Sequence, residues 1–488
     1  MTNNLKVLFL SAEAEPFVKI GGLADVAGAL PQALTALPEK PDIRLVLPFY
    51  PRIKRKQLTV EAVASFQIPH ENGPIQADVV LTWQGGLPVY LIGGTPVEET
   101  ELIYSSDVFA DGHKFTFFSL AALELCKILD WQPDLIHAQD WHTACAVYAI
   151  KTRYADDSFY QDMPTLLTVH NLPYLGNGAG PALKAFGLSP ATESNLPWWA
   201  QDMPLPLGLL KADKINTVST GYADEMLTPE FGSGLEEFLQ SRSDDLLGIL
   251  NGLDQHSWNP QTDTRLTENF NIKKLHRRKS NKSSLQKELN LPEEPNVPLL
   301  AFIGRMDHQK GVEIALNALK FIQHMDWQAV ILGTGNPELE NQAKRFESEM
   351  PDRLRALIRF DGDLARRIYG GADIMMIPSR YEPCGLIQMI AMRYGCVPVA
   401  RATGGLKDTI TDYGESNSST GFLFEQADPV EMAAALERAL VTYKDKRRWP
   451  HLQKRGMSKD FSWKKSAAQY FQLYQSLVEK KLSEKNPR

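Results

Sequence analysis

The sequence predicts an α/β fold made of two domains, each with a mostly parallel sheet covered by helices. The chain has 488 residues, more than one hydrophobic core usually supports, so two domains of roughly 200 to 250 residues are expected. Short apolar runs rich in β-formers alternate with helical patterns in both halves, which is typical of parallel sheets. A polar stretch at residues 240–300 separates the halves. We therefore predict an amino-terminal domain over residues 1–250 and a second domain from residue 251.

The first half shows the alternation in order. Strands are expected where apolar runs are short, and helices where the apolar spacing follows a helical period or small residues accumulate. The middle of this half, after residue 50, is also rich in strand patterns. The expected strands are 6–12, 42–50, 134–140, 165–171 and 214–220, and the expected helices are 22–37, 115–129 and 141–154.

The second half restarts the same alternation after the basic run KKLHRRKSNKSSLQKE (273–288). That run is interpreted as a solvated helix face or as a site for a polyanion. The expected strands lie within 298–306, 328–335, 358–362, 372–379 and 397–405, and a helix is expected at 310–323.

The composition limits the class of protein. Hydrophobic residues make up 43% of the chain and charged residues 23%, with a formal net charge of −7. These values are those of a globular protein and argue against nucleic acid or an anionic membrane as a partner. Four cysteines without a CxxC pair fit a reducing cytoplasm. No secretory signal or membrane span is expected, so the predicted location is cytoplasmic.

Two similar glycine loops occur, one in each half. GGLADV (21–26), preceded by Lys19, and GGLKDT (404–409) both follow a strand and precede a helix. Glycine lets a backbone approach a ligand closely, and a helix N-terminus favours an anion. The alternative at residues 19–23 is a tight turn with a surface lysine.

Charged side chains follow two strands of the second half. Arg305 and Lys310 in GRMDHQKG come where open parallel sheets bind ligands, and this pair of cations would suit a diphosphate. A solvent-exposed loop is the alternative. Glu382 in SRYEPCGLIQ either faces a ligand or caps the helix that follows, and Cys384 is interpreted as structural.

Histidines and an aspartate follow strands of the first half. Their spacing fits no compact metal-ligand set, so no metal is expected, and hydrogen bonding to a polyhydroxylated ligand is the functional interpretation. A structural role stays open for His137. There is no P-loop, no dinucleotide fingerprint and no nucleophile elbow, and no cofactor is predicted. The residues concerned are His137, Asp140, His142 and His170.

Taken together, the motifs resemble the bacterial glycogen synthase and plant starch synthase family. The matching text includes KIGGLADVAGALP, HAQDWHTA, TVHNLPYLG, GRMDHQKG, SRYEPCGL and RYGCVPVARATGGLKDT. The resemblance implies a GT-B fold, with two Rossmann-like lobes facing across a deep cleft. It also implies that the last helix, residues 463–488, returns to the first lobe and that the second lobe spans 251–462.

The resemblance further implies a retaining transfer of glucose from ADP-glucose, or UDP-glucose in some relatives, to the non-reducing end of glycogen or another α-1,4-glucan, without a metal. It assigns catalytic roles to Glu382, His170, Arg305 and Lys310. It assigns donor contacts to Lys19, Gly21, Gly22, Asn251, Gln309, Phe360, Cys384, Gly385, Gly404 and Gly405, and sugar or acceptor contacts to Asp25 and Asp140.

Several positions depart from the family pattern. The family commonly has HAHDWH where this chain has Gln139 in HAQDWH. Ile387 and Ile390 replace the family's usual Thr and Tyr after EPCGL. Sucrose-type and trehalose-type synthases are alternatives, but they commonly carry a second acid at the position of Ile390. A glucan- or sugar-nucleotide-binding protein without catalysis is the alternative from another class.

Overall fold

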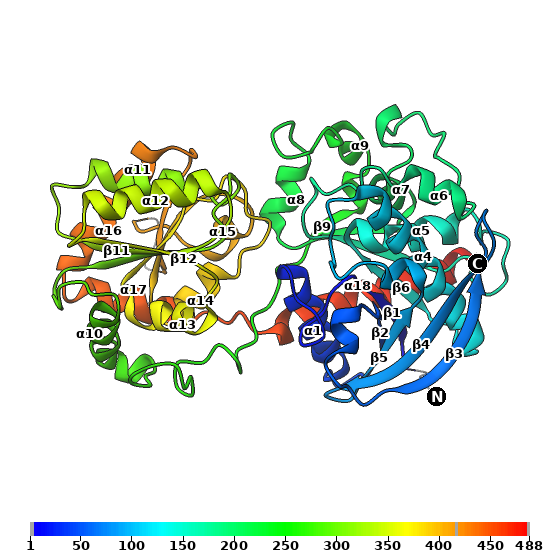
Figure 1. Cartoon of the computed structure of the whole chain (residues 1–488), viewed down its shortest axis with the longest axis horizontal. Helices are drawn as coiled ribbons and strands as arrows, with labels where there is room; N and C mark the ends of the chain where they lie inside the picture. Colours follow the sequence, from blue (N-terminus) through cyan, green and yellow to red (C-terminus); the bar gives the residue numbers. More distant parts are fainter. Residues whose placement is uncertain (1–3, 415–417, 486–488) are drawn as a thin grey trace. The chain divides into compact units, whose positions relative to one another are not determined.

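The computed structural model describes residues 4–414 and 418–485. They form two compact units. The amino-terminal unit contains Met1–Gly252 together with Trp463–Arg488, and the carboxy-terminal unit contains Leu253–Ser462. Each unit has one sheet and its own helices (Figure 1), which confirms the predicted α/β class.

The sheet of the amino-terminal unit has nine strands. Apolar runs such as KVLFL are almost wholly buried because helices cover both faces, as a parallel sheet requires. In spatial order the strands are β3 (Glu61–Ile68), β4 (Ile75–Gln84), β5 (Leu87–Gly93), β2 (Asp42–Pro48), β1 (Lys6–Leu10), β6 (Leu135–Gln139), β7 (Thr165–Val169), β8 (Lys214–Thr217) and β9 (Leu246–Gly248).

Strand β4 departs from the parallel arrangement, since it runs antiparallel to both β3 and β5. The connections explain this difference. Only the turn at Gly85 and Gly86 separates β4 from β5, and both glycines have positive φ angles, of 56° and 89°. A connection this short can join only antiparallel neighbours, whereas a parallel pair needs a crossover of a dozen or more residues.

Helices cover both faces of this sheet. The last one, α18, belongs to the amino-terminal unit although the chain of the other unit precedes it. It packs against α1, as Figure 1 shows with α18 in red and α1 in blue. The helices are α1 (Gly22–Thr35), α2 (Pro51–Lys54), α3 (Thr95–Glu98), α4 (Val108–Ile128), α5 (Asp140–Lys151), α6 (Gly180–Ala185), α7 (Pro204–Lys211), α8 (Thr220–Met226), α9 (Glu236–Ser241) and α18 (Trp463–Lys485).

A buried hydrogen bond ties α18 to the centre of the sheet. The hydroxyl of Tyr474 lies 2.7 Å from Nδ1 of His137, and Nε2 of the same histidine lies 2.7 Å from the Thr168 hydroxyl. Both ring nitrogens are therefore satisfied inside the core, where burial lowers the pKa of His137 well below its usual value. His137 has the structural role that the sequence left open.

The carboxy-terminal unit has a six-stranded sheet whose strands are all parallel. In spatial order the strands are β12 (Leu354–Ile358), β11 (Gln328–Gly333), β10 (Leu299–Ile303), β13 (Ile374–Ile377), β14 (Val397–Arg401) and β15 (Phe422–Phe424). The helices are α10 (Arg278–Glu288), α11 (Val312–Phe321), α12 (Pro337–Glu349), α13 (Gly362–Gly371), α14 (Ile387–Arg393), α15 (Gly404–Thr409), α16 (Pro429–Lys444) and α17 (Arg448–Met457).

Two cations of the basic run are buried, which neither a solvated face nor a polyanion site predicts. Lys282 on α10 pairs with Asp373 at 2.7 Å and with the Tyr443 hydroxyl at 3.0 Å. Arg278 donates to the backbone carbonyls of Tyr369 and Ala372. These two side chains therefore fasten α10 to its unit.

The order of the strands defines one special point in each sheet. In the first sheet, β2 pairs with one side of β1 and the later strand β6 pairs with the other side. In the second sheet, β11 pairs with one side of β10 and the later strand β13 pairs with the other side. Ligands of open α/β sheets bind outside the carboxyl ends of the strands at such switch points. A ligand is therefore expected beside the segments that follow β1, β6, β10 and β13.

Within the described residues, no helix combines the length and the apolar character that crossing a membrane requires.

Replacing Tyr474 with Phe should lower the free energy of unfolding of the amino-terminal unit by about 1–3 kcal/mol, because buried His137 loses one of its partners. Urea titration monitored by circular dichroism measures this change. Ser476→Ala, an exposed change on the same helix, should stay within about 0.5 kcal/mol of the parent. Equal unfolding curves for both variants would contradict the role given to this hydrogen bond.

Candidate active site

Glu13, which the sequence analysis did not select, organises the loop after β1. Its side chain is 2% exposed, and its carboxylate accepts the backbone N–H of Ile20 at 2.5 Å and that of Gly21 at 3.2 Å. Tyr104 also hydrogen-bonds to it, but burial dominates and raises the pKa of Glu13 above its usual value. The available signal was the first of the two acidic residues in SAEAEP, which comes shortly after a buried strand.

Lys19 lies between two carboxylates. Its ammonium group is 2.8 Å from Glu15 and 2.7 Å from Asp25, the acidic residue in the first turn of α1. Partial burial disfavours the charge, but Asp25 and Glu15 outweigh it and raise the pKa of Lys19. An ammonium has three donors, so one remains beyond these two contacts.

The glycines near the start of α1 differ in what surrounds them. A Cβ built on Gly28 would lie 2.3 Å from the carbonyl oxygen of Glu15, so the packing of the helix requires glycine there. A Cβ on Gly22 would have no atom within 4 Å, and one on Gly21 would meet only Glu13, at 3.6 Å. The packing of the described residues therefore does not explain Gly21 and Gly22, and the space beside them is open.

Asp140 and His170 meet at the carboxyl ends of β6 and β7. Asp140 begins α5 with φ = 54°, a left-handed conformation that costs a non-glycine residue energy and is enriched at functional sites. In this conformation its carboxylate accepts the backbone N–H of His170 at 2.7 Å and also that of Asn171. The Nε2 atom of the His170 ring lies 2.8 Å from Oε1 of Gln139.

Burial shifts the pKa values of these groups in opposite directions. It raises the pKa of Asp140 to about 7, although two backbone N–H groups oppose the shift, and it lowers the pKa of His170 to about 3. Between pH 3 and about 6.5 the unfolded chain therefore binds a proton that folded His170 lacks, so this histidine makes stability fall as the pH drops. Asp140 acts oppositely, because between pH 3.8 and 7 the folded state binds the extra proton.

Two more candidate residues, His142 and Asn251, are buried in this unit. His142 is buried among Tyr104, Phe115 and Trp141. Asn251 follows β9 and is 6% exposed, and its side-chain Oδ1 has no hydrogen-bond partner in the described part of the chain. A buried acceptor without a donor requires an explanation, and a ligand hydroxyl would provide one.

Lys310 and Glu382 form the centre of the site in the carboxy-terminal unit. They are 72 residues apart, yet the ammonium and carboxylate groups lie 2.5 Å from each other because β10 and β13 are neighbours. The Ser379 hydroxyl donates to the same carboxylate at 3.0 Å. Helix α14 begins at Ile387 with Leu386 at its N-cap, so the interpretation of Glu382 as a helix cap is wrong.

Arg305 and Gln309 extend this arrangement. The Arg305 guanidinium is 3.1 Å from Asp307 and donates to Gln309 Oε1 at 3.1 Å, and it remains largely exposed. Gln309 Nε2 in turn donates to the carbonyl of Tyr381 at 3.3 Å. The segments after β10 and β13 are thus bonded to each other and present a guanidinium and an ammonium at one edge of the sheet.

The glycines of the second loop are required by close backbone packing. A Cβ on Gly405 would lie 2.1 Å from the carbonyl oxygen of buried Cys384, and the Gly405 N–H donates to the carbonyl of Glu382 at 3.0 Å. Gly385 and Gly404 have positive φ angles of 72° and 41°. The GGLKDT loop is therefore seated directly on the Glu382–Gly385 segment, whereas GGLADV is open.

Phe360 follows β12, two strands away from β10, and its side chain is 92% exposed. A phenyl ring without packing partners exposes apolar surface to water at a cost, which a stacked planar ligand would remove.

Two further features bear on the site. In residues 4–414 and 418–485, no group of three or more His, Cys, Asp and Glu side chains could hold a metal ion.

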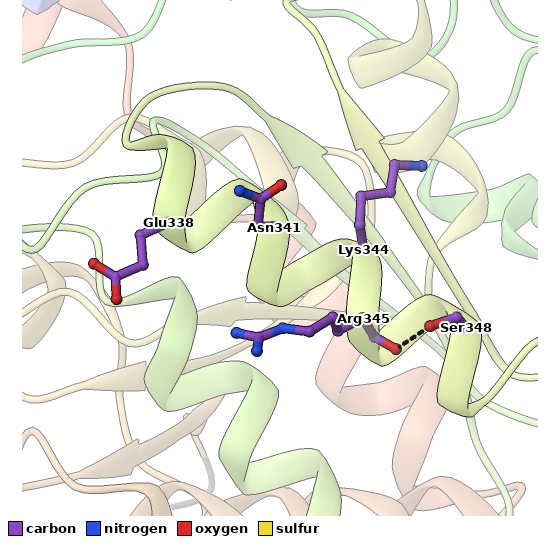
Figure 2. Close-up of a pocket in the computed structure, with 5 residues that line it drawn as sticks. All are labelled: Glu338, Asn341, Lys344, Arg345 and Ser348. Carbon is purple, nitrogen blue, oxygen red and sulfur yellow. Dashed lines mark hydrogen bonds between the residues drawn. The ribbon is translucent and has the colours of Figure 1, made fainter.

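A surface hollow of about 700 Å³ lies elsewhere in the carboxy-terminal unit (Figure 2). Five polar side chains of the single helix α12 line it, and none of them belongs to the predicted set: Glu338, Asn341, Lys344, Arg345 and Ser348.

Comparison with known proteins agrees with this geometry. Residues 6–241 match the family described as Starch synthase catalytic domain, and residues 297–441 match Glycosyl transferases group 1. The chain is 37% identical to a glycogen synthase of Syntrophotalea carbinolica, over 97% of this chain and 99% of that protein. It is 39% identical to a glycogen synthase of Geotalea daltonii, over 98% and 100%.

Solved structures show the same relationship. The catalytic domain of starch synthase IV from Arabidopsis thaliana, bound to ADP and acarbose, superimposes with a TM-score of 0.88 at 33% identity, covering 98% of this chain and 100% of that one. A sucrose-phosphate synthase from Thermosynechococcus elongatus has a TM-score of 0.62 at 18% identity, which shows the fold alone.

Two α/β units with mostly parallel sheets, matched over 98% of this chain by starch synthase IV, define a glycosyltransferase of the GT-B class. Within that class, the chain belongs to the glycogen synthase family.

Replacing Glu13 with Ala should release the backbone N–H groups of Ile20 and Gly21, since a hydrogen bond to a charged acceptor contributes about 1.5–3 kcal/mol. Hydrogen exchange at these two amides should therefore become roughly 10- to 100-fold faster. Mass spectrometry of a peptide covering the loop measures the rate.

Glu13→Gln, which keeps one accepting oxygen, should give an intermediate rate, and Glu61→Ala on β3 should have no effect on this loop. Unchanged exchange in Glu13→Ala would show that the loop holds its shape without the carboxylate.

Proposed function

We propose that this enzyme transfers glucose from ADP-glucose to the non-reducing end of an α-1,4-glucan with retention of configuration. The observation that carries the proposal is the placement of Lys310, Glu382 and Arg305 at the β10–β13 switch point. A nucleoside diphosphate needs cations at such a point. Starch synthase IV from Arabidopsis thaliana, at 33% identity, is a relative with bound ADP and acarbose.

In this proposal the cations act on the leaving group. Arg305 and Lys310 bind the diphosphate and stabilise the negative charge that develops when the glucosyl bond breaks. Gln309 holds the Arg305 side chain in place. Glu382, already paired with Lys310, accepts hydrogen bonds from glucosyl hydroxyls, and the backbone at Cys384, Gly385, Gly404 and Gly405 supplies donors to the sugar and phosphate. Phe360 stacks on the base.

The amino-terminal unit contributes polar groups suited to a sugar. Carboxylates bind hydroxyl groups strongly. Asp25 lies in the first turn of α1, and Asp140 follows β6 with His170 beside it. The remaining N–H of the Lys19 ammonium group donates to the diphosphate of ADP-glucose. The open space at Gly21 and Gly22 admits this ligand. Asn251 gives its unpartnered oxygen to a hydroxyl. No metal or cofactor is proposed.

The donor preference is tested by incubating the enzyme with radiolabelled ADP-glucose or UDP-glucose, with and without glycogen. We expect labelled polymer from ADP-glucose in the presence of glycogen and markedly less from UDP-glucose. Digestion of the product by an enzyme specific for α-1,4 bonds reports the retained configuration. Polymer growth from neither donor would overturn the proposed reaction, and growth from UDP-glucose alone would overturn the choice of base.

Gly22→Ala and Gly405→Ala form a matched pair. The alanine Cβ at position 22 has no atom within 4 Å, so the thermal unfolding midpoint should be unchanged. The value of kcat/KM for ADP-glucose should fall on the order of tenfold or more, because the methyl group enters the space proposed for the ligand. Gly405→Ala should instead lower the unfolding midpoint, since its Cβ collides with Cys384. Full activity in Gly22→Ala would remove this loop from the donor site.

A further inference from the structure

Gln139 contacts the ring of His170 from inside the protein. It is the last residue of β6, it is 0% exposed, and its Oε1 lies 2.8 Å from His170 Nε2. Its backbone is fixed as well, because its N–H donates to the Thr143 hydroxyl at 2.6 Å and its carbonyl accepts from that hydroxyl at 2.8 Å. The amide oxygen therefore has little freedom to move away from the imidazole.

This contact determines which nitrogen of His170 carries the proton. With the amide oxygen of Gln139 toward the ring, this group can only accept, so the histidine donates through Nε2–H and a neutral imidazole then has a lone pair on Nδ1. In the described part of the chain, Nδ1 of His170 has no hydrogen-bond partner, and the residue is partly exposed. The ring thus presents an acceptor outward.

Burial, and not a neighbouring charge, keeps the ring neutral. The basic groups that interact with it, His137 at β6 and His142 on α5, are buried and have pKa values well below the usual value, and Lys114 on α4 acts on His142. The carboxylate of Asp140 is directed to the backbone N–H of His170, not to its ring. The negative charge of Glu13, in the loop after β1, contributes to raising the pKa of Asp140. Burial accordingly lowers the pKa of His170.

We propose that Gln139 is a positioning residue that holds His170 as the neutral Nε2–H tautomer, so that Nδ1 accepts a hydrogen bond from a hydroxyl of the sugar substrate. The sugar part of this inference rests on the proposed function, whereas the tautomer does not. The family's more common histidine at this position could donate or accept according to its own tautomer. An amide does not titrate, so Gln139 gives His170 the same partner at every working pH.

The tautomer is measured directly by NMR on protein labelled with ¹⁵N in the histidine rings, with the His170 signals assigned from their loss in His170→Gln. We expect the wild-type protein at pH 7.5 to carry the proton on Nε2 and to stay neutral down to pH 5. Gln139→Leu should give a mixture of tautomers. A wild-type proton on Nδ1, or an unchanged tautomer in Gln139→Leu, would overturn the proposal whether or not the protein transfers glucose.

Gln139→Glu tests the same contact by charge. A carboxylate beside the ring should raise the pH of half-protonation of His170 by about 1 to 3 units, and the acid limb of the kcat profile should move upward with it. Gln139→Leu should lower kcat on the order of tenfold or more without such a shift. An acid limb that does not move in Gln139→Glu would count against the proposal.

Gln286→Leu is the matched control, since Gln286 is a buried glutamine of the carboxy-terminal unit whose side chain donates to Gln328 and to the Glu294 carbonyl. It should leave the His170 signals and the pH profile unchanged. A change equal to that in Gln139→Leu would show that loss of any buried amide is sufficient, and would overturn the specific role.

Discussion

The order of the parallel strands is the constraint on which the rest of the molecule depends. A crossover between parallel strands returns the chain to the end of the sheet where the previous strand began. The loops that follow parallel strands therefore all lie at the same edge of the sheet, the edge of the carboxyl ends. At the β10–β13 switch point this brings Lys310 and Glu382 together across 72 residues. At the β1–β6 switch point it brings together the Glu13 loop and Asp140. Neither arrangement requires the site residues to be near one another in sequence.

The amino-terminal site concentrates groups that are costly to bury. Glu13, Asp140 and His170 each have pKa values shifted toward the neutral form by burial, and Asp140 has a left-handed backbone in addition. The cost of burying Glu13 and Asp140 is partly offset by backbone N–H donors directed at their carboxylates. Such a site is preorganised, because its polar groups are already oriented before a substrate arrives and need not reorganise during the reaction.

Much of the fold could be predicted from the sequence, because strands buried on both faces are uniformly apolar and strands and helices alternate. The direction of β4 was not predicted, because it follows from the two-residue Gly85–Gly86 turn, a hairpin signal, and not from the hydrophobic pattern on which the prediction was based. For the site, the motifs identified Glu382 and Lys310 but not their ion pair, because sequence does not order the strands in space. Glu13 was missed for another reason: it acts mainly through the backbone N–H groups of Ile20 and Gly21, which no side-chain motif records.

The position of α18 has a consequence for how the protein is made. Tyr470, Phe471, Tyr474 and Leu477 belong to the hydrophobic core of the amino-terminal unit, although the whole carboxy-terminal unit is translated before them. Synthesis proceeds from the amino terminus at about 5–20 residues per second, so the first unit waits for its final helix on the order of ten seconds or more. During that interval the surface that α18 covers has no partner, and the whole carboxy-terminal unit is synthesised before that surface is covered.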